Sequence, residues 1–177
     1  MRKLVESTFV TLDGVISNPQ ERSPPYWDDE HRTYASELLF AADALVLGRA
    51  TYGGFAEAWP ARSGDPYTDK INSMPKYVAS RTLTEVTWNA EILRGDAVEA
   101  VAGLMQQPGE NLLKFGSGEF SKALAAQGVV DEYHFWLFPV LAGSGDRLFD
   151  GVDTTHLHLV DTTRFKSGIV VLKYTPK

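Results

Sequence analysis

Apolar and polar residues alternate along this chain in blocks of strand and helix length. Runs rich in valine, leucine, isoleucine and aromatic residues, bounded by glycine, proline or polar clusters, are typical of strands. The most apolar run covers residues 131–141 and predicts a strand inside a sheet. The predicted strands cover residues 3–12, 44–47, 76–80, part of 86–93, 112–115, 131–141, 157–165 and 169–175.

Other segments show the spacing of amphipathic helices. Asp28 and Asp29 can cap one helix, and Asp96 can cap another, because a carboxylate oxygen accepts from the free N–H groups of a first turn. A pair of glycines at 53–54 predicts that the helix starting near residue 51 is short. Gly128 suits a left-handed helix end. The predicted helices cover 30–42, 51–59, 96–107 and 119–127, and the predicted loops include 18–25 and 60–66.

Strands that alternate with helices indicate an α/β fold. The last two strands follow one another through a short connection at 166–168, which is typical of a hairpin. The sheet is therefore predicted to be mostly parallel with an antiparallel edge. The length of 177 residues fits one domain over residues 1–177, and the sequence has no internal repeat or linker.

Composition and charge narrow the class of protein. The 17 basic and 23 acidic residues give a net charge of −6, which argues against nonspecific nucleic-acid binding. The absence of cysteine excludes disulfides, thiolate nucleophiles and cysteine metal sites. No segment has the roughly 20 apolar residues of a membrane span, and the N-terminal segment lacks a signal-peptide core. We expect a cytoplasmic protein.

Three predicted strands end in turns that suit phosphate groups. The turn at 116–118 (Gly-Ser-Gly) joins a strand to a helix and presents free backbone N–H groups to an anion. The turn at 48–51 (Gly-Arg-Ala-Thr) adds an arginine fork and a hydroxyl group. The turn at 80–82 (Ser-Arg-Thr) suits a phosphate monoester, such as the 2′-phosphate of NADP. Each of these turns also fits an ordinary polar connection when taken alone.

The repetition of such turns is more informative than any one of them. The turn at 116–118 is not a full dinucleotide fingerprint, because Ser121 stands where the third glycine would be. Ligands of α/β sheets nevertheless gather at the carboxyl ends of strands. We therefore predict that these turns hold the two ends of one phosphorylated cofactor.

Other chemistry finds little support in the sequence. His156 and His158 share one face of a predicted strand, but no third ligand accompanies them, so no metal site is predicted. No G-x-S-x-G motif is present to mark a hydrolase nucleophile.

Taken together, these segments resemble the dihydrofolate reductase-like superfamily, in the branch that contains the reductase domain of riboflavin biosynthesis, the RibD C-terminal domain. The resemblance implies a three-layer α/β/α fold with a mixed, mostly parallel sheet and an antiparallel C-terminal hairpin. It also implies NADPH as the cofactor and a homodimer. The matching segments occur in the family's order and cover residues 7–14, 44–52, 77–83, 113–120 and 129–149.

The resemblance assigns a role to each turn. In this superfamily the first turn holds phosphate, the second faces the adenosine 2′-phosphate, and the glycine turn binds the pyrophosphate through its amides. Superfamily members often have a cis Gly-Gly peptide in the glycine turn, and for the Gly-Ser peptide of this chain either isomer is open. The implied cofactor-binding residues are Gly48, Arg49, Thr51, Ser80, Arg81, Thr82, Gly116, Ser117, Gly118, Glu119 and Phe120.

The resemblance also brings the loop after the first strand to the nicotinamide. Asp13 is the predicted catalytic residue, as the polar group nearest the reacting centre. A turn role is equally open, because an Asp-Gly pair is typical of tight turns. By the same resemblance, the segment 139–145 shapes either the substrate side or a subunit contact.

One departure from the superfamily pattern concerns the proton donor. Dihydrofolate reductases place an acidic residue early in the first helix, and the equivalent region here, 30–33, has no unambiguous carboxylate. Asp28, Asp29 and Glu30 are the nearby choices, and all three also suit a helix start. Folate is therefore a weak candidate substrate.

The sequence thus predicts an NADPH-dependent reductase that transfers hydride to a C=N or C=O carbon of a small heterocycle, pteridine- or ribosylaminopyrimidine-like. One alternative is an NADP(H)-binding protein of the same fold that is not catalytic and acts as a sensor. A further alternative is a ring-binding protein that does not use the cofactor. No nucleic-acid or membrane partner is predicted.

Overall fold

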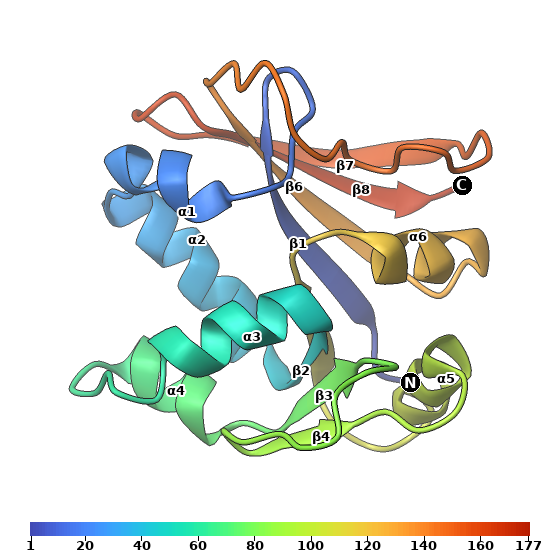
Figure 1. The fold of residues 1–177 in the computed structure, drawn as a ribbon. Helices are drawn as coiled ribbons and strands as arrows, with labels where there is room; N and C mark the ends of the chain where they lie inside the picture. Colours follow the sequence, from blue (N-terminus) through green and yellow to red (C-terminus); the bar gives the residue numbers. More distant parts are fainter.

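Eight strands form one mixed sheet in the computed structural model, which describes residues 1–177 (Figure 1). The strands are β1 (Leu4–Thr11), β2 (Ala42–Gly48), β3 (Lys76–Ala79), β4 (Ala90–Ile92), β5 (Asn111–Phe115), β6 (Glu132–Phe138), β7 (Leu157–Arg164) and β8 (Val170–Pro176). Their order across the sheet is β4-β3-β2-β5-β1-β6-β8-β7.

The first six strands run parallel to one another, and β8 alone runs in the opposite direction. The parallel pairs are β4 with β3, β3 with β2, β2 with β5, β5 with β1, and β1 with β6. β8 pairs antiparallel with both β6 and β7. The predicted fold class, a mostly parallel sheet with an antiparallel C-terminal hairpin, is therefore confirmed.

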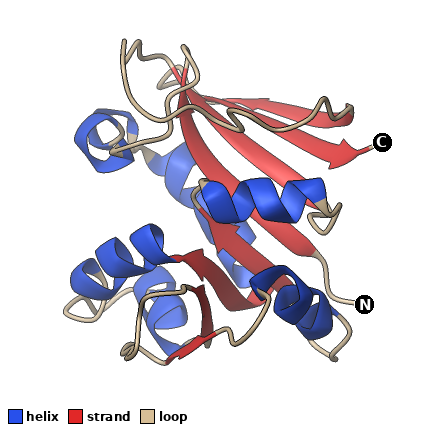
Figure 2. Ribbon diagram, turned by 45° about the vertical axis from the view of Figure 1, so that its right-hand side comes forward, coloured by secondary structure: helices blue, strands red, loops and turns tan.

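Helices cover both faces of the sheet and make three layers (Figure 2). The segments α2, α3 and α4 pack on one face, and α5 and α6 pack on the other. No helix has the length and apolar character that crossing a membrane requires. The helical segments are α1 (Pro19–Arg22), the 3-10 turn η1 (Pro24–Tyr26), α2 (Asp29–Phe40), α3 (Arg49–Ala58), α4 (Pro66–Ser73), α5 (Ala97–Met105) and α6 (Glu119–Ala126).

Three local predictions were wrong or incomplete. The predicted loop at 18–25 contains α1 and the start of η1. Helix α3 runs for ten residues through both glycines. Tyr52 and Phe55 pack against the core, and this packing offsets the low helix propensity of the two glycines. Helix α4 was not predicted, although the Asp65 carboxylate accepts from the Thr68 N–H group at 3.0 Å as a regular cap.

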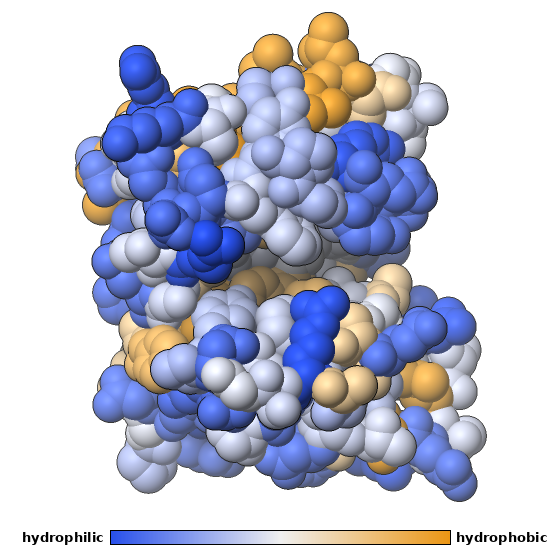
Figure 3. Space-filling view, turned by 90° about the vertical axis from the view of Figure 1, so that its left-hand side faces the viewer, coloured by the Kyte–Doolittle hydropathy of each residue, from blue (hydrophilic) through white to orange (hydrophobic).

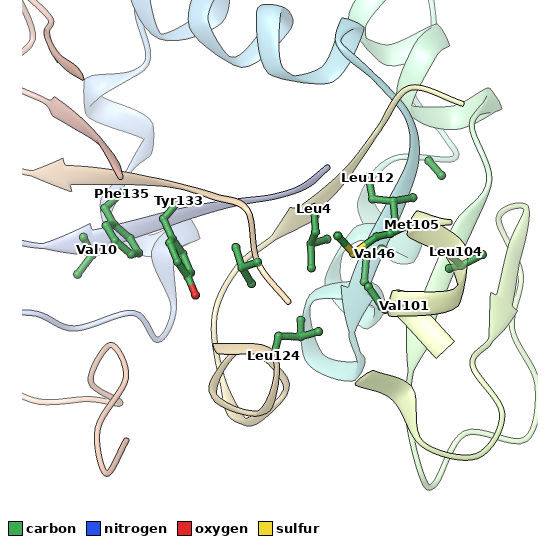
Figure 4. Packing of buried hydrophobic residues seen from close by; sticks show 12 residues of the cluster. Leu4, Val10, Val46, Val101, Leu104, Met105, Leu112, Leu124, Tyr133 and Phe135 are labelled. Carbon is green, nitrogen blue, oxygen red and sulfur yellow. The ribbon is translucent and has the colours of Figure 1, made fainter. Parts of the chain in front are cut away.

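Each face of the sheet has its own apolar cluster. The cluster beneath α5 and α6 joins buried residues of β1, β2, β5 and β6 to both helices (Figure 4). The opposite cluster joins β2, β3 and β5 to Leu39 of α2, Tyr52 of α3 and Ile71 of α4. Because both faces are covered, most residues of the parallel strands β1, β2 and β6 are buried, as is usual for such strands.

Two buried histidines belong to the aromatic packing between α2 and the sheet. His31, on the first turn of α2, lies 5.7 Å from the Phe9 ring and 5.0 Å from the Trp136 ring, and stacks on Trp27. His134 of β6 contacts the Tyr34 hydroxyl at 2.7 Å. Burial lowers the pKa of both imidazoles, and in His134 this outweighs the opposing effect of a neighbouring carboxylate.

These histidines predict a pH-dependent stability. An imidazole with a lowered pKa binds its proton more weakly in the folded than in the unfolded chain, so stability is full above the unfolded value of 6.5 and falls as pH decreases. His31→Gln should reduce the slope of unfolding free energy against pH below about pH 7, where the imidazole of the unfolded chain begins to bind its proton. Urea unfolding measures the slope, and His158→Gln on exposed β7 is the matched control. An unchanged slope in His31→Gln would contradict the prediction.

Candidate functional site

The three predicted turns lie side by side at one edge of the sheet. β3, β2 and β5 are neighbours, and Gly48 is in register with Ala79 while Leu47 is in register with Phe115. The turns that follow these strands therefore start at nearly the same level. The structure brings the segments 48–51, 80–82 and 116–118 together as the sequence suggested.

Helix starts at this edge differ from those of the other helices of eight or more residues. Helices α2, α4 and α5 each begin at an aspartate whose carboxylate accepts from first-turn N–H groups. Helices α3 and α6 begin at Gly48 and Gly118, and neither has a side-chain cap. Their first-turn N–H groups therefore remain available to an external acceptor, and both helix dipoles present their positive end there.

The glycine turn combines a strained backbone position with an open one. Gly116 has φ of +73°, and a Cβ added there would lie 2.7 Å from Thr51 Oγ1. Gly118 has an extended backbone and nothing within 4 Å of an added Cβ. The peptide between Gly116 and Ser117 is trans, as are all others. The buried Ser117 Oγ has no hydrogen-bond partner in the protein. The turn thus offers a hydroxyl group, free amides and open space.

The arginines of the other two turns are free of protein partners. Arg49 and Arg81 are exposed and make no ion pair or hydrogen bond with the protein. The Ser80 hydroxyl oxygen accepts from the N–H groups of Thr82 (3.2 Å) and Leu83 (3.0 Å). Ser80 therefore shapes its own turn and leaves the Arg81 guanidinium in solvent, where it suits an anion.

The last two predicted cofactor residues lie in the first turn of α6. Glu119 is exposed and pairs with Lys122 at 2.7 Å. The Phe120 ring packs against the apolar cluster beneath α6. Only the backbone N–H groups of these two residues are directed to the shared edge by the helix start, so their side chains do not define the site.

Beside the glycine turn, β1 extends further than β5. β5 pairs with β1 only up to Ser7 and Phe115, whereas β6 pairs with β1 as far as Thr11. The outer part of β1 therefore has no strand on its β5 side. A space-filling view shows a hollow with an apolar floor between the part carrying α1 and α2 and the part carrying α3 and α4 (Figure 3).

Asp13 links the loop after β1 to the segment near residue 142. Its carboxylate accepts from the Thr11 hydroxyl (2.6 Å), the Ala142 N–H (3.0 Å) and the Gly143 N–H (2.8 Å). The Arg147 guanidinium donates to its carbonyl at 2.7 Å. These hydrogen bonds, the Thr11 bond above all, hold the pKa of the Asp13 carboxyl well below its usual range. The side chain is therefore ionised at neutral pH.

The three carboxylates near the start of α2 all have partners. Asp28 caps the helix by accepting from the His31 N–H at 2.8 Å. Asp29 pairs with Arg32 one turn along the helix. Glu30 Oε2 accepts from the Lys166 N–H at 2.7 Å and so ties α2 to the turn between β7 and β8. Because each of these three carboxylates has a partner, none of them is an unpaired acid facing the sheet, as a proton donor of the superfamily type would be.

Two residues near this edge carry polar chemistry that the sequence pattern did not reveal. His31 is buried, and its Nε2 has no partner. Lys114 is buried at the end of β5, and its Nζ donates to the carbonyl of Gly116 at 2.7 Å. A lysine in a short strand predicts a solvent-facing position, so only the alternation of Leu112, Lys114 and Gly116 hinted at its inward direction.

A separate cavity of about 420 Å³ lies at the opposite, amino end of β1, β5 and β6. Its lining includes Tyr34, Glu132, His134 and Lys173, which form one connected network. In this network His134 contacts both Tyr34 and Glu132, and Lys173 pairs with Glu132, so these polar side chains satisfy one another. The cavity lies away from the three turns and is not part of the site.

The sheet order, the uncapped helices and the adjacent phosphate-type turns define an α/β protein of the dihydrofolate reductase-like class. The family model of the RibD C-terminal domain matches residues 2–171. The chain therefore belongs to the RibD C-terminal domain family.

Two individual proteins are similar to this chain over almost its whole length. The chain is 28% identical over 179 residues to the uncharacterized protein YyaP of Bacillus subtilis, covering 98% of this chain and 94% of that protein. A putative riboflavin biosynthesis protein from Shewanella has the same fold, with TM-score 0.75, 23% identity and 99% coverage of both chains.

A longer protein contains the same fold as one part. It is the diaminohydroxyphosphoribosylaminopyrimidine deaminase/5-amino-6-(5-phosphoribosylamino)uracil reductase of Thermotoga maritima, with TM-score 0.70 and 15% identity. The match covers 99% of this chain and 57% of that one. At this level of identity the likeness concerns the fold alone.

Alanine substitutions at the two glycines of the turn should change the unfolding free energy by different amounts. Gly116→Ala should lower the unfolding free energy by about 1–3 kcal/mol, because of the positive φ and the contact with Thr51. Gly118→Ala should change it by less than ~0.5 kcal/mol, because its backbone is extended and the space is open. Urea unfolding of both variants checks this, and equal losses would contradict the described turn.

Proposed function

We propose that this protein is an NADPH-dependent reductase that transfers hydride to a C=N or C=O carbon of a small flat heterocycle. A pteridine or a ribosylaminopyrimidine is the substrate class that its family suggests. The observation that carries the proposal is the shared edge of β3, β2 and β5, where two uncapped helices and two unpaired arginines meet.

The residues at this edge fit the charged parts of the cofactor. The amides and the unpartnered Ser117 hydroxyl would hold the pyrophosphate, supported by Gly48, Arg49 and Thr51. Gly118 leaves room for a phosphate oxygen close to the backbone. Arg81, with Ser80 and Thr82 in its turn, would bind the 2′-phosphate. This arrangement favours NADPH over NADH because only NADPH carries the 2′-phosphate, whose negative charge Arg81 would pair with.

The reaction in this proposal depends mainly on orientation. Bound NADPH supplies the hydride, and the protein holds the two rings in reacting geometry. Asp13 contributes an ionised carboxylate that fixes the loop beside the outer part of β1. Because its pKa lies far below neutrality, Asp13 orients this loop rather than donating a proton, and water supplies the proton.

Titration with NADPH and NADH, followed by nicotinamide fluorescence, tests the proposal. We expect NADPH to bind more tightly, and NADPH to be oxidised in the presence of one member of a pterin, pyrimidine and quinone panel. Binding of neither nucleotide would overturn the proposal. Binding of NADPH without oxidation by any panel member would favour the noncatalytic sensor instead.

Arg81→Ala separates the 2′-phosphate contact from the rest of the site. One charge-assisted hydrogen bond contributes ~1.5–3 kcal/mol, so the variant should lose most of its preference for NADPH over NADH. The ratio of the two dissociation constants measures this directly. Arg164→Ala on β7, at the far edge of the sheet, is the matched control. An unchanged ratio in Arg81→Ala would remove this residue from the site.

A further inference from the structure

Lys114 lies behind the glycine turn with its ammonium group enclosed by protein. Its side chain is 3% exposed, and Glu6 beside it is fully buried, with 3.5 Å between Nζ and Oε2. Nζ also donates to Ser121 Oγ at 2.5 Å and to the Gly116 carbonyl at 2.7 Å. The ammonium group thus donates hydrogen bonds to a helix and a turn, and it lies within ion-pair distance of a carboxylate on a strand.

The contact with Gly116 determines the direction of the next peptide plane. In a trans peptide the carbonyl and the following N–H point to opposite sides, and the peptide between Gly116 and Ser117 is trans. Lys114 and Ser121 lie on the face of the sheet that α6 covers. Holding the Gly116 carbonyl on that face turns the Ser117 N–H toward the opposite side, where Gly116 meets Thr51 of α3.

We propose that Lys114 is a positioning residue that clamps the Gly116–Ser117 peptide plane so that the Ser117 N–H faces the cofactor pyrophosphate. The inference rests on the proposed function, since it assigns the ligand of that turn. Gly116 needs such a clamp, because glycine allows a wider range of backbone angles than any other residue. Without the ammonium group the plane is free to rotate and the N–H is no longer presented.

A general structural role for Lys114 makes a different prediction. If Lys114 only anchored α6 through Ser121, its loss would disturb the whole edge and weaken every ligand there. If it acts on the Ser117 amide, only ligands with a pyrophosphate are weakened. Adenosine 2′-monophosphate carries the group expected at Arg81 and lacks the pyrophosphate. It therefore distinguishes the two roles within one protein.

The test uses a charge-neutral pair of substitutions. Glu6→Gln/Lys114→Met removes both charges together, so neither buried charge is left unpaired. We expect NADPH affinity to fall about ten- to a hundredfold, the effect of losing one charge-assisted hydrogen bond. Affinity for adenosine 2′-monophosphate should stay within about threefold. Ser121→Ala removes the contact with α6, keeps Glu6 and Lys114 paired and leaves Lys114 on the Gly116 carbonyl, so it is the matched control, with NADPH affinity retained within about threefold.

The outcomes separate this inference from the proposed function. Unchanged NADPH binding in the double variant, equal loss in Ser121→Ala, or parallel loss of both ligands would each overturn the clamp while leaving the reductase proposal intact. A lack of NADPH binding by the unaltered protein would overturn both. If the double variant does not fold, amide NMR of the unaltered protein decides. The Ser117 N–H must shift strongly on addition of NADPH, and an unmoved signal would overturn the clamp.

Discussion

A buried ammonium group joins the parts of this protein that meet at the end of β5. Removing a lysine and a glutamate from water is costly, and such a pair persists only where each charge has close partners. Glu6 comes from β1, Lys114 from β5, and Ser121 from α6. Burial raises the pKa of Glu6 and lowers that of Lys114, whereas their mutual attraction opposes both shifts. The contacts therefore fix the turn relative to two strands and one helix.

The longer helices are of two kinds: some have a side-chain cap at their start, and others leave their first-turn N–H groups without one. Three aspartates satisfy the first turns of α2, α4 and α5 from within the chain. Glycines precede α3 and α6, and a glycine has no side chain with which to accept. A cap contributes about 1 kcal/mol to stability. Among the helices of eight or more residues, the chain forgoes that contribution only at the edge where three turns converge, which is where an external anion would take the place of the cap.

Much of the architecture was predictable because it depends on local patterns. Apolar runs located the strands, and Asp96 marked the start of α5 because capping involves neighbours in sequence. The adjacency of the turns followed from a general property of parallel sheets. Helix α3 was misjudged because its length depends on packing of Tyr52 and Phe55 against distant strands, which local propensity does not include.

The partners of charged groups were not predictable from local patterns. The carboxylate of Asp13 receives two N–H groups from residues about 130 positions later in the chain. The sequence showed an Asp-Gly pair typical of a turn, and it could not show which distant backbone would supply the donors. Lys114 presents the same difficulty, because its burial depends on Glu6 and Ser121 being brought together by the sheet.

The edge of the sheet also changes in character from β3 to β1. At β3, β2 and β5 it offers amides, hydroxyl groups and arginines. Next to β5, the outer part of β1 carries Phe9, His31 packs beside that ring, and Trp27 stacks on His31. The imidazole of His31 is kept neutral by burial, so this end has little charge to solvate. A ligand with phosphates at one end and a flat ring at the other matches this gradient in one orientation only, with the ring against β1. In that orientation the phosphate end would be recognised by residues that the sequence reveals, and the ring end by packing that only the fold creates.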